Sequence, residues 1–131
     1  MTRYRVVALS VALLMAAVVF AQKVEKEGKA WLSQYTEPAA INVAGKWGAG
    51  DWGTITLNQA EGSRELTGSC TDGWVVDGVV SGKKIYLLFS HKGTVNYCAE
   101  LEAESADLLT GQYRRGMMSG KEKLRPIVLK K

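Results

Sequence analysis

Histidine occurs once in these 131 residues and cysteine only twice. Zinc in proteins is held mainly by several histidine and cysteine side chains, so this scarcity excludes a zinc site. No Cys-x-x-Cys pair, no phosphate-binding glycine loop between a strand and a helix, and no Asp-x-Asp-x-Asp-Gly calcium loop occurs. Asp51, Asp72 and Asp77 stand among glycines, where turn capping explains them. We therefore expect no metal and no cofactor.

Catalytic side chains are equally scarce. His91 directly follows Ser90 near the expected end of a strand, but a general base must face its nucleophile and needs an orienting acid. Glu100 and Glu102 point the same way along a strand, where we expect an exposed acidic strip rather than a perturbed acid pair. The sequence therefore indicates a protein that is not an enzyme.

A single long apolar run is present, at the N-terminus. Arg3 and Arg5 precede an uncharged stretch, residues 6–20, and small residues precede a cleavage point after Ala21. These features predict a secretory signal peptide at residues 1–21. The run is shorter than the roughly 20 apolar residues that cross a bilayer, so an uncleaved membrane anchor is the less favoured alternative. We expect a periplasmic or extracellular protein that touches a membrane only if the leader is retained.

A large charge of one sign is absent from the mature chain. Without Arg3 and Arg5, 15 basic residues face 13 acidic ones, and the net charge falls from +4 to +2. We therefore expect no nucleic-acid partner. The distribution is less even, because residues 114–131 hold seven basic residues and a single acid, Glu122. Two interpretations stay open: solvated strand faces, or a basic patch for an anionic surface.

Residues 22–40 are polar and rich in charge. Val24, Trp31 and Tyr35 fall roughly along one helical face, and Pro38 ends the pattern. The segment has too few apolar residues to fold alone. We predict a linker or a short, loosely docked amphipathic helix.

From residue 41 onward the sequence consists of short runs of alternating apolar residues separated by glycines, a pattern typical of an all-β protein. The predicted strands cover residues 45–49, 52–59, 65–71, 74–81, 84–91, 94–104, 108–114 and 123–129. Short connections make successive strands antiparallel neighbours. Because closure removes exposed sheet edges, we predict a small up-and-down barrel at residues 41–131, with a two-sheet sandwich as the alternative.

Cys70 and Cys98 suggest a disulfide, since an exported chain with two cysteines meets an oxidising compartment. The strand pattern raises an objection. Cys70 shares a face with Leu66, which should point inward, whereas Cys98 shares a face with glutamates, which should point outward. Pairing then needs a bulge at residues 71–73 or 96–97 to change the parity, or a position of Cys98 near the end of the barrel. Two separate buried thiols are the alternative.

Aromatic side chains are the remaining candidates for function. In a barrel several of them could converge on one mouth, and four are the candidate ligand contacts: Trp47, Trp52, Trp74 and Tyr86. Trp52 shares its face with threonines and Tyr86 lies opposite the apolar side of its strand. An aromatic among polar neighbours suits stacking on a sugar or ring, or anchoring a protein partner. Cross-strand packing on the outer face is the alternative.

Four short motifs carry a resemblance. They are Gly45-Lys46-Trp47, Leu57-Asn58-Gln59, Leu66-Thr67-Gly68 and Leu109-Thr110-Gly111-Gln112-Tyr113. Together they resemble small secreted bacterial β-barrel domains of the avidin-like and lipocalin-like kind. The resemblance implies the barrel architecture and no particular ligand-binding residue.

These observations favour an exported, non-enzymatic module that binds a small molecule, a glycan or a protein surface. The competing hypothesis is a secreted inhibitor or interaction protein that contacts an enzyme through the basic segment from Arg114. An uncharacterised enzyme is the third and least supported. The deciding feature is the barrel interior, because an open cavity favours ligand binding inside it and a filled one directs the search to the outer surface.

Overall fold

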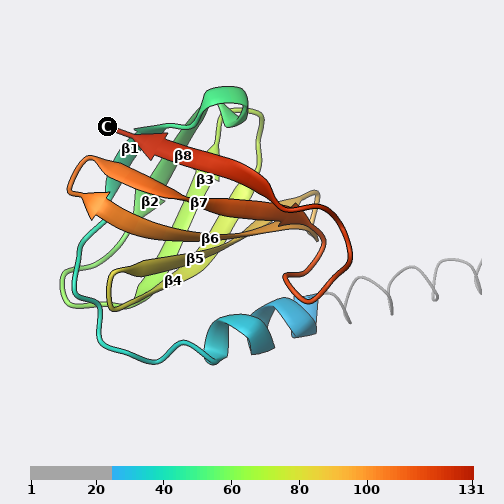
Figure 1. Cartoon of the computed structure of the whole chain (residues 1–131), viewed down its shortest axis with the longest axis horizontal. Coiled ribbons are helices and arrows are strands. Elements are labelled where there is room, and N and C mark those ends of the chain that lie inside the picture. The colour runs from blue at the N-terminus through green and yellow to red at the C-terminus, as the bar shows by residue number, and fades with distance from the viewer. Residues whose placement is uncertain (1–24) are drawn as a thin grey trace, which may run out of the picture.

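The computed structural model describes residues 25–131, so the predicted leader lies outside the described residues. Within that range a helix over residues 25–33 precedes eight strands and one 3-10 turn, η1 (Figure 1). The elements in order are β1 (Gly45–Gly48), η1 (Gly50–Trp52), β2 (Thr54–Asn58), β3 (Glu65–Cys70), β4 (Val75–Ser81), β5 (Lys84–His91), β6 (Thr94–Ser105), β7 (Leu108–Arg115) and β8 (Arg125–Lys130). The all-β prediction is confirmed.

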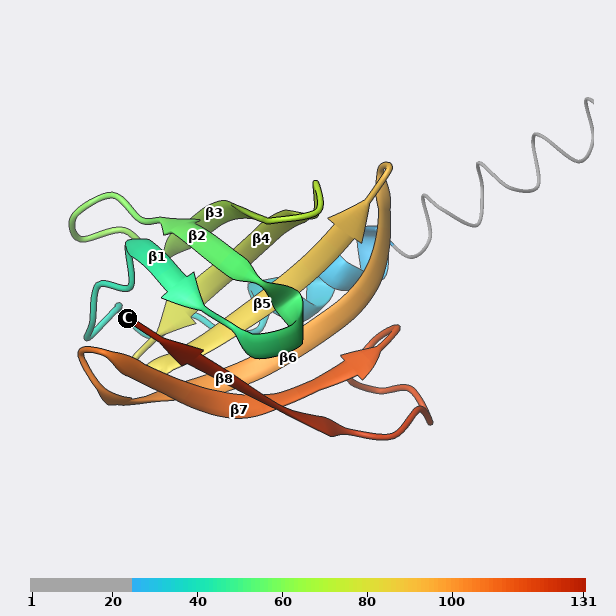
Figure 2. The ribbon, with the colours of Figure 1, turned by 90° about the horizontal axis from the view of Figure 1, so that it is seen from above.

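The strands form a closed barrel in chain order, each antiparallel to the next. Figure 2 shows β1–β8 curving round a common interior, with the helix outside the wall. The ring closes through a single residue pair between β1 and β8, Gly48 and Lys130. This topology confirms the predicted up-and-down barrel and agrees with the architecture that the resemblance implies. The two-sheet sandwich is wrong.

Apolar side chains fill the barrel interior. Alternation along each strand directs every second residue inward. The largest of these are at most 2% exposed: Trp47, Ile55, Leu57, Leu66, Val76, Ile85, Leu87, Phe89, Leu101, Leu109 and Leu129. They form one continuous cluster. The barrel centre is therefore protein, and the search for a ligand site moves to the barrel ends and the outer surface.

Three interior glycines let the wall bend tightly round this core. A Cβ added at Gly68, Gly78 or Gly111 would collide with a backbone carbonyl oxygen of the adjacent strand. These positions lie on β3, β4 and β7, where neighbouring backbones approach more closely than a side chain permits. Glycine at these points is a requirement of the small barrel.

The helix over residues 25–33 docks on the outside of β5. The Tyr35 ring stacks on the Tyr86 ring with 3.5 Å between centroids, and Trp31 meets Tyr86 edge-on at 5.7 Å. Gly28 lies against Leu88, so close that an added Cβ would be 2.9 Å from Leu88 Cδ1. Of the two forms predicted for residues 22–40, the structure shows the amphipathic helix, docked by an aromatic stack.

The connection from the helix to β1 is also bound to the barrel. Arg64 Nη1 donates a hydrogen bond to Tyr35 O at 2.9 Å, and the Ala40 amide donates to Gly82 O at 2.9 Å. Both contacts fix the C-terminal side of the helix at the β4–β5 turn and the start of β3. Within residues 25–131, no helix has the length and apolarity needed to cross a membrane.

The predicted disulfide is wrong, because Cys70 and Cys98 are free, buried thiols in the structure. Cys70 packs inside the barrel, whereas Cys98 packs on the outer face under the helix, beside Tyr86. A bulge does occur where β6 passes Phe89 and Ser90 of β5. It lies on the N-terminal side of Cys98, so it leaves Cys98 on the outer face of the strand. The two thiols therefore lie on opposite faces of the barrel wall, as the alternation of the strands indicates, and do not pair.

Candidate functional site

The four aromatic candidates separate into two groups. Trp47 is 1% exposed inside the barrel, where its indole Nε1 donates a hydrogen bond to Val43 O at 2.9 Å. Tyr86 is 4% exposed beneath the helix. Burial there, with the Glu100 carboxylate as the next cause, raises the pKa of Tyr86 to about 12. Neither ring presents a surface to a ligand, so only Trp52 and Trp74 stay as candidates.

Trp52 and Trp74 meet at one end of the barrel. The Trp52 indole stacks on Phe89 with 4.5 Å between centroids and meets Trp74 edge-on at 5.9 Å. Tyr97 and Tyr113 also approach Trp52 edge-on, at 5.2 and 5.3 Å. Edge-to-face contacts at these separations are the favoured geometry of aromatic pairs. Trp52 is thus the centre of an aromatic cluster that caps the filled interior.

The η1 turn places Trp52 at this end. The sequence predicts a strand from Trp52 onward, which would put the indole on the outer face with Thr54; that boundary is wrong, because β2 starts at Thr54. Gly53 has a φ of +73°, and an added Cβ there would lie 2.7 Å from Thr71 Oγ1. The reversal at Gly53 therefore turns the chain before β2 and carries Trp52 over the barrel mouth.

His91 and Tyr97 also lie at this end, on either side of the β5–β6 bulge. Phe89 pairs with Tyr97 but Ser90 pairs with Val95, so Asn96 is the extra residue on β6. The bulge lets Val95 pack outside, under the helix, while Tyr97 packs inside. The His91 ring lies 4.9 Å from the Trp74 ring. We call the set Trp52, Trp74, His91, Tyr97 and Tyr113 the aromatic end.

A small pocket of about 240 Å³ adjoins the aromatic end. Its lining comprises Tyr97, Tyr113, Arg115, Glu122, Lys123 and Arg125. Tyr97 of β6 pairs directly with Arg115 of β7, and Tyr113 of β7 pairs directly with Arg125 of β8. Three cations and one carboxylate thus surround two tyrosine rings. We call this hollow the cationic pocket.

The loop between β7 and β8, residues 116–124, forms one side of the cationic pocket. Arg114 organises it, because Nη1 of that guanidinium donates hydrogen bonds to the backbone oxygens of Met118 and Gly120. Met117 and Met118 also pack against the cluster beneath the helix. The loop is therefore held at its base, while Glu122 and Lys123 near its end are exposed.

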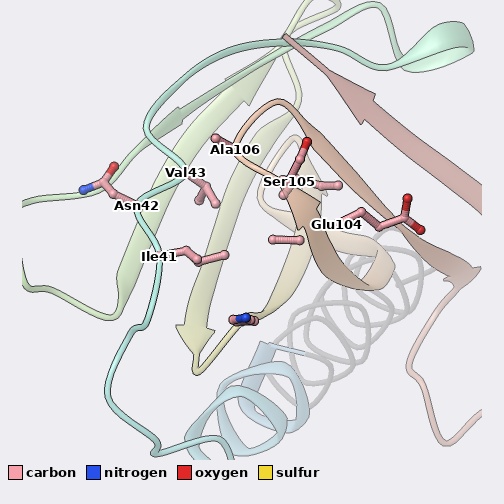
Figure 3. Close-up of a pocket in the computed structure, with 9 residues that line it drawn as sticks. Ile41, Asn42, Val43, Glu104, Ser105 and Ala106 are labelled. Carbon is pink, nitrogen blue, oxygen red and sulfur yellow. The ribbon is translucent and has the colours of Figure 1, made fainter.

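The opposite end of the barrel has a pocket of about 310 Å³ between the segment before β1 and the β6–β7 turn. Figure 3 shows Ile41 and Val43 directed toward this hollow, with the Asn42 and Glu104 side chains directed away from it. Two polar groups of its rim are engaged, since Asn42 Oδ1 accepts from the Ala44 amide and Glu104 Oε1 accepts from Thr110 Oγ1. Lys83 also lines the hollow, but no aromatic side chain does.

A third hollow, of about 790 Å³, separates the helix from the outer faces of β3 and β4. Its walls include Leu32 of the helix and Val75 and Val79 of β4. Val75 is 51% exposed, so the hollow is open to solvent. Its aromatic lining residue is Tyr35, whose ring already stacks on Tyr86.

The alternation of the strands already carried a signal for the residues that sequence reasoning left out of the site. Tyr113 shares a face with Leu109, and antiparallel pairing then brings Arg125 beside Tyr113. The run from Arg114 was interpreted only as a whole, without dividing it between the two faces of the wall. Tyr97 shares the inward face of β6 with Ala99 and Leu101, so alternation also places its ring inside, and the bulge at Asn96 redirects only the residues before it.

Comparison of the chain with models of known protein families, with curated proteins and with solved structures gave no match.

Proposed function

We propose that this chain is an exported, non-enzymatic binding module whose ligand site is the aromatic end of the barrel. The observation that carries the proposal is the convergence of Trp52, Trp74, Tyr97 and Tyr113 as partly buried rings above a filled core. Their mutual contacts give each ring a fixed orientation. A rigid aromatic surface binds a flat or ring-shaped ligand at low entropic cost.

Position also favours the aromatic end. Its residues come from the η1 turn, the turn before β4, and β5, β6 and β7, so its side chains are supported by barrel backbone on several sides. The cationic pocket opens beside it and adds charged groups for orientation. A rigid apolar platform with a few polar groups at its margin is the usual composition of a small-ligand site.

The geometry at Ser90 and His91 favours binding over catalysis. Ser90 lines the groove on the outer face, while His91 packs against Trp74 at the aromatic end. The two side chains therefore lie on opposite sides of β5 and do not form a nucleophile and base pair. His91 instead contributes a ring to the binding surface.

A second candidate function is supported by the loop of residues 116–124. Arg114 holds its backbone through two hydrogen bonds, and Lys121 and Lys123 are exposed on it. A loop held in one conformation suits an inhibitor of a secreted hydrolase, because little flexibility is lost on binding. Inhibition of extracellular proteases and cell-wall hydrolases, lost in a Lys121→Ala/Lys123→Ala variant, would support this alternative.

The primary proposal is tested by screening the chain from Gln22 onward against arrays of glycans and small metabolites. We expect one ligand class to bind, and the Trp74→Ala variant to lose at least about fivefold in affinity, since stacking on one aromatic side chain is worth about 1–3 kcal/mol. Tyr86→Phe is the matched control, because Tyr86 is an aromatic outside the site. Unchanged binding by Trp74→Ala would overturn the assignment. The mass of the exported chain tests cleavage after Ala21.

A further inference from the structure

We propose that the cationic pocket recognises the acid group of a sugar acid, a pyranose ring that carries a carboxylate. This inference rests on the proposed function and adds the chemical class of the ligand. The pyranose ring lies against the tyrosines of the pocket floor, and the carboxylate faces the arginines above them. The argument depends on strand register, on unpaired charge and on the mixture of polar groups.

Register places both arginines on the ligand side of the wall. Residues directly opposite each other in an antiparallel ladder project from the same face. Arg115 is opposite Tyr97, and Arg125 is opposite Tyr113. Both tyrosines pack against the interior cluster, so both arginines belong to the interior-facing rows, at the last position before the barrel ends. Both arginines are exposed, and their position in those rows puts them at the rim of the barrel mouth beside the two tyrosines.

The cations of the pocket are not neutralised by partners. The ion pairs found in residues 25–131 are Lys29 with Glu25 and Lys84 with Glu100. Neither pair involves Arg115, Lys123 or Arg125, although Glu122 lines the same pocket. Three cations beside one carboxylate leave a net positive charge. An anionic group bound there gains charge-assisted hydrogen bonds, and a guanidinium holds a carboxylate through two parallel ones.

The remaining polar groups suit hydroxyls. Glu122 accepts hydrogen bonds, and each tyrosine hydroxyl both donates and accepts. A bare inorganic anion would use the cations and leave Glu122 and the tyrosine hydroxyls without a role. A ring with several hydroxyls and one carboxylate matches the whole set. The rings of Tyr97 and Tyr113, 6.0 Å apart, supply the apolar surface for the ring carbons.

The pocket is also compatible with a single ring rather than a long polyanion. Its volume is about 240 Å³, and its cations lie round one hollow instead of along a stripe. A nucleic-acid backbone would need an extended basic surface that follows the phosphates. The compact arrangement therefore favours recognition of one acidic sugar residue at a time, with neighbouring sugars extending toward Trp52 and Trp74.

The test is isothermal titration of the chain from Gln22 onward with three probes. Trigalacturonate carries ring and charge, its fully methyl-esterified form carries the ring without the charge, and sodium sulfate carries charge without the ring. We expect measurable binding of trigalacturonate only, with an affinity that falls as salt rises. The Arg115→Gln/Arg125→Gln variant should bind at least about tenfold less tightly. Lys46→Gln is the control, because Lys46 is an exposed cation on β1.

Each other outcome overturns the inference in a recognisable way. Equal binding of the esterified trimer would reject the role of the carboxylate and leave the aromatic end as a neutral-ring site. Equal binding of sulfate would reject the role of the ring. No binding of trigalacturonate would reject the ligand class, whereas the proposed function fails separately, if Trp74→Ala leaves the binding of every array ligand unchanged. The arginine variant folds if its circular dichroism matches that of Lys46→Gln.

Discussion

At the scale of single residues, burial determines the reactivity of the two thiols. Burial raises the pKa of Cys70 and of Cys98 from the ordinary value of 9.0 to about 11. For Cys98 the Arg114 guanidinium acts in the opposite direction but does not outweigh burial. Since the thiolate is the reactive form, both side chains are inert near neutral pH. They serve as small apolar groups in two separate clusters.

The first prediction concerns the oxidation state of these cysteines. Cys70 and Cys98 lie on opposite faces of the wall, so we expect two free thiols in the folded protein, even after purification without reductant. Denaturation followed by a thiol-specific reagent should report two thiols per chain, and the native protein should report close to none within minutes. Finding no thiol after denaturation would contradict the placement of the two side chains.

The second prediction concerns pH. An acid whose pKa is raised by folding stabilises the folded state fully below its unfolded pKa and loses that stabilisation as pH rises through the folded pKa. The melting temperature should therefore fall between pH 9 and 11, where unfolded thiols ionise and folded ones do not. Tyr86 adds a further decline from pH 10 to about 12.

The control for this pH dependence is the Cys70→Ala/Cys98→Ala variant. It should lose the part of the decline between pH 9 and 10 and keep the part that Tyr86 causes. An equally steep fall of the melting temperature from pH 9 to 10 in the variant would show that other groups are responsible.

At the scale of elements, the helix over residues 25–33 acts as a cover. Beneath it lie Tyr86, Leu88 and Cys98, which would otherwise form an apolar patch on the outside of the barrel. Trp31, 9% exposed, is the main helical side chain in this contact. The helix is too short to be stable alone, so its stability comes from packing against the barrel.

The third prediction follows from that contact. Trp31→Ala removes the edge-on ring against Tyr86 and should let the helix open more often. Alkylation of Cys98 should then accelerate about tenfold or more, which corresponds to about 1.4 kcal/mol of lost docking energy. Cys70, inside the barrel, is the internal control, and peptide mass spectrometry reads both. Equal acceleration at the two cysteines would indicate global destabilisation instead.

The fourth prediction concerns the wall of the barrel. Gly111→Ala places a methyl group against the backbone of β6, so β7 must move away from its neighbour. We expect a loss of about 1–3 kcal/mol in the free energy of unfolding, as for other overpacked positions. Gly48→Ala, on β1, is the control, because an added Cβ there meets only Lys130 O, at an ordinary contact distance of 3.5 Å. Urea denaturation measures both, and equal midpoints would contradict the close approach at Gly111.

Strand positions were predictable because alternation and glycine are local signals. The predicted ranges for β5, β6 and β7 agree with the structure to within one residue at each end. Trp52 was misplaced because the positive φ of Gly53, which redirects the chain, is not a property of hydrophobic alternation. The stacking of Tyr35 on Tyr86 was also not predictable from local patterns, since the two residues are far apart in sequence.

At the scale of the whole molecule, the two barrel ends differ in their side chains. One end carries an aromatic cluster and a pocket with unpaired cations, while the pocket at the other end has no aromatic lining residue. The filled interior supports both ends and excludes a ligand from the barrel axis. Sequence reasoning identified two members of the aromatic end, Trp52 and Trp74. It missed the arginines, because the basic run from Arg114 was not divided between the inward and outward faces of β7 and β8.

The four tryptophans allow the central claim to be tested in one spectrum. Trp31 lies under the helix, Trp47 in the interior, and Trp52 and Trp74 at the aromatic end. In a nitrogen-15 correlation spectrum each indole N–H gives one signal, assigned by single Trp→Phe variants. On titration with trigalacturonate, the account predicts that the Trp52 and Trp74 signals shift while those of Trp31 and Trp47 stay in place. A shift confined to Trp31, or no shift at the aromatic end at millimolar ligand, would contradict it.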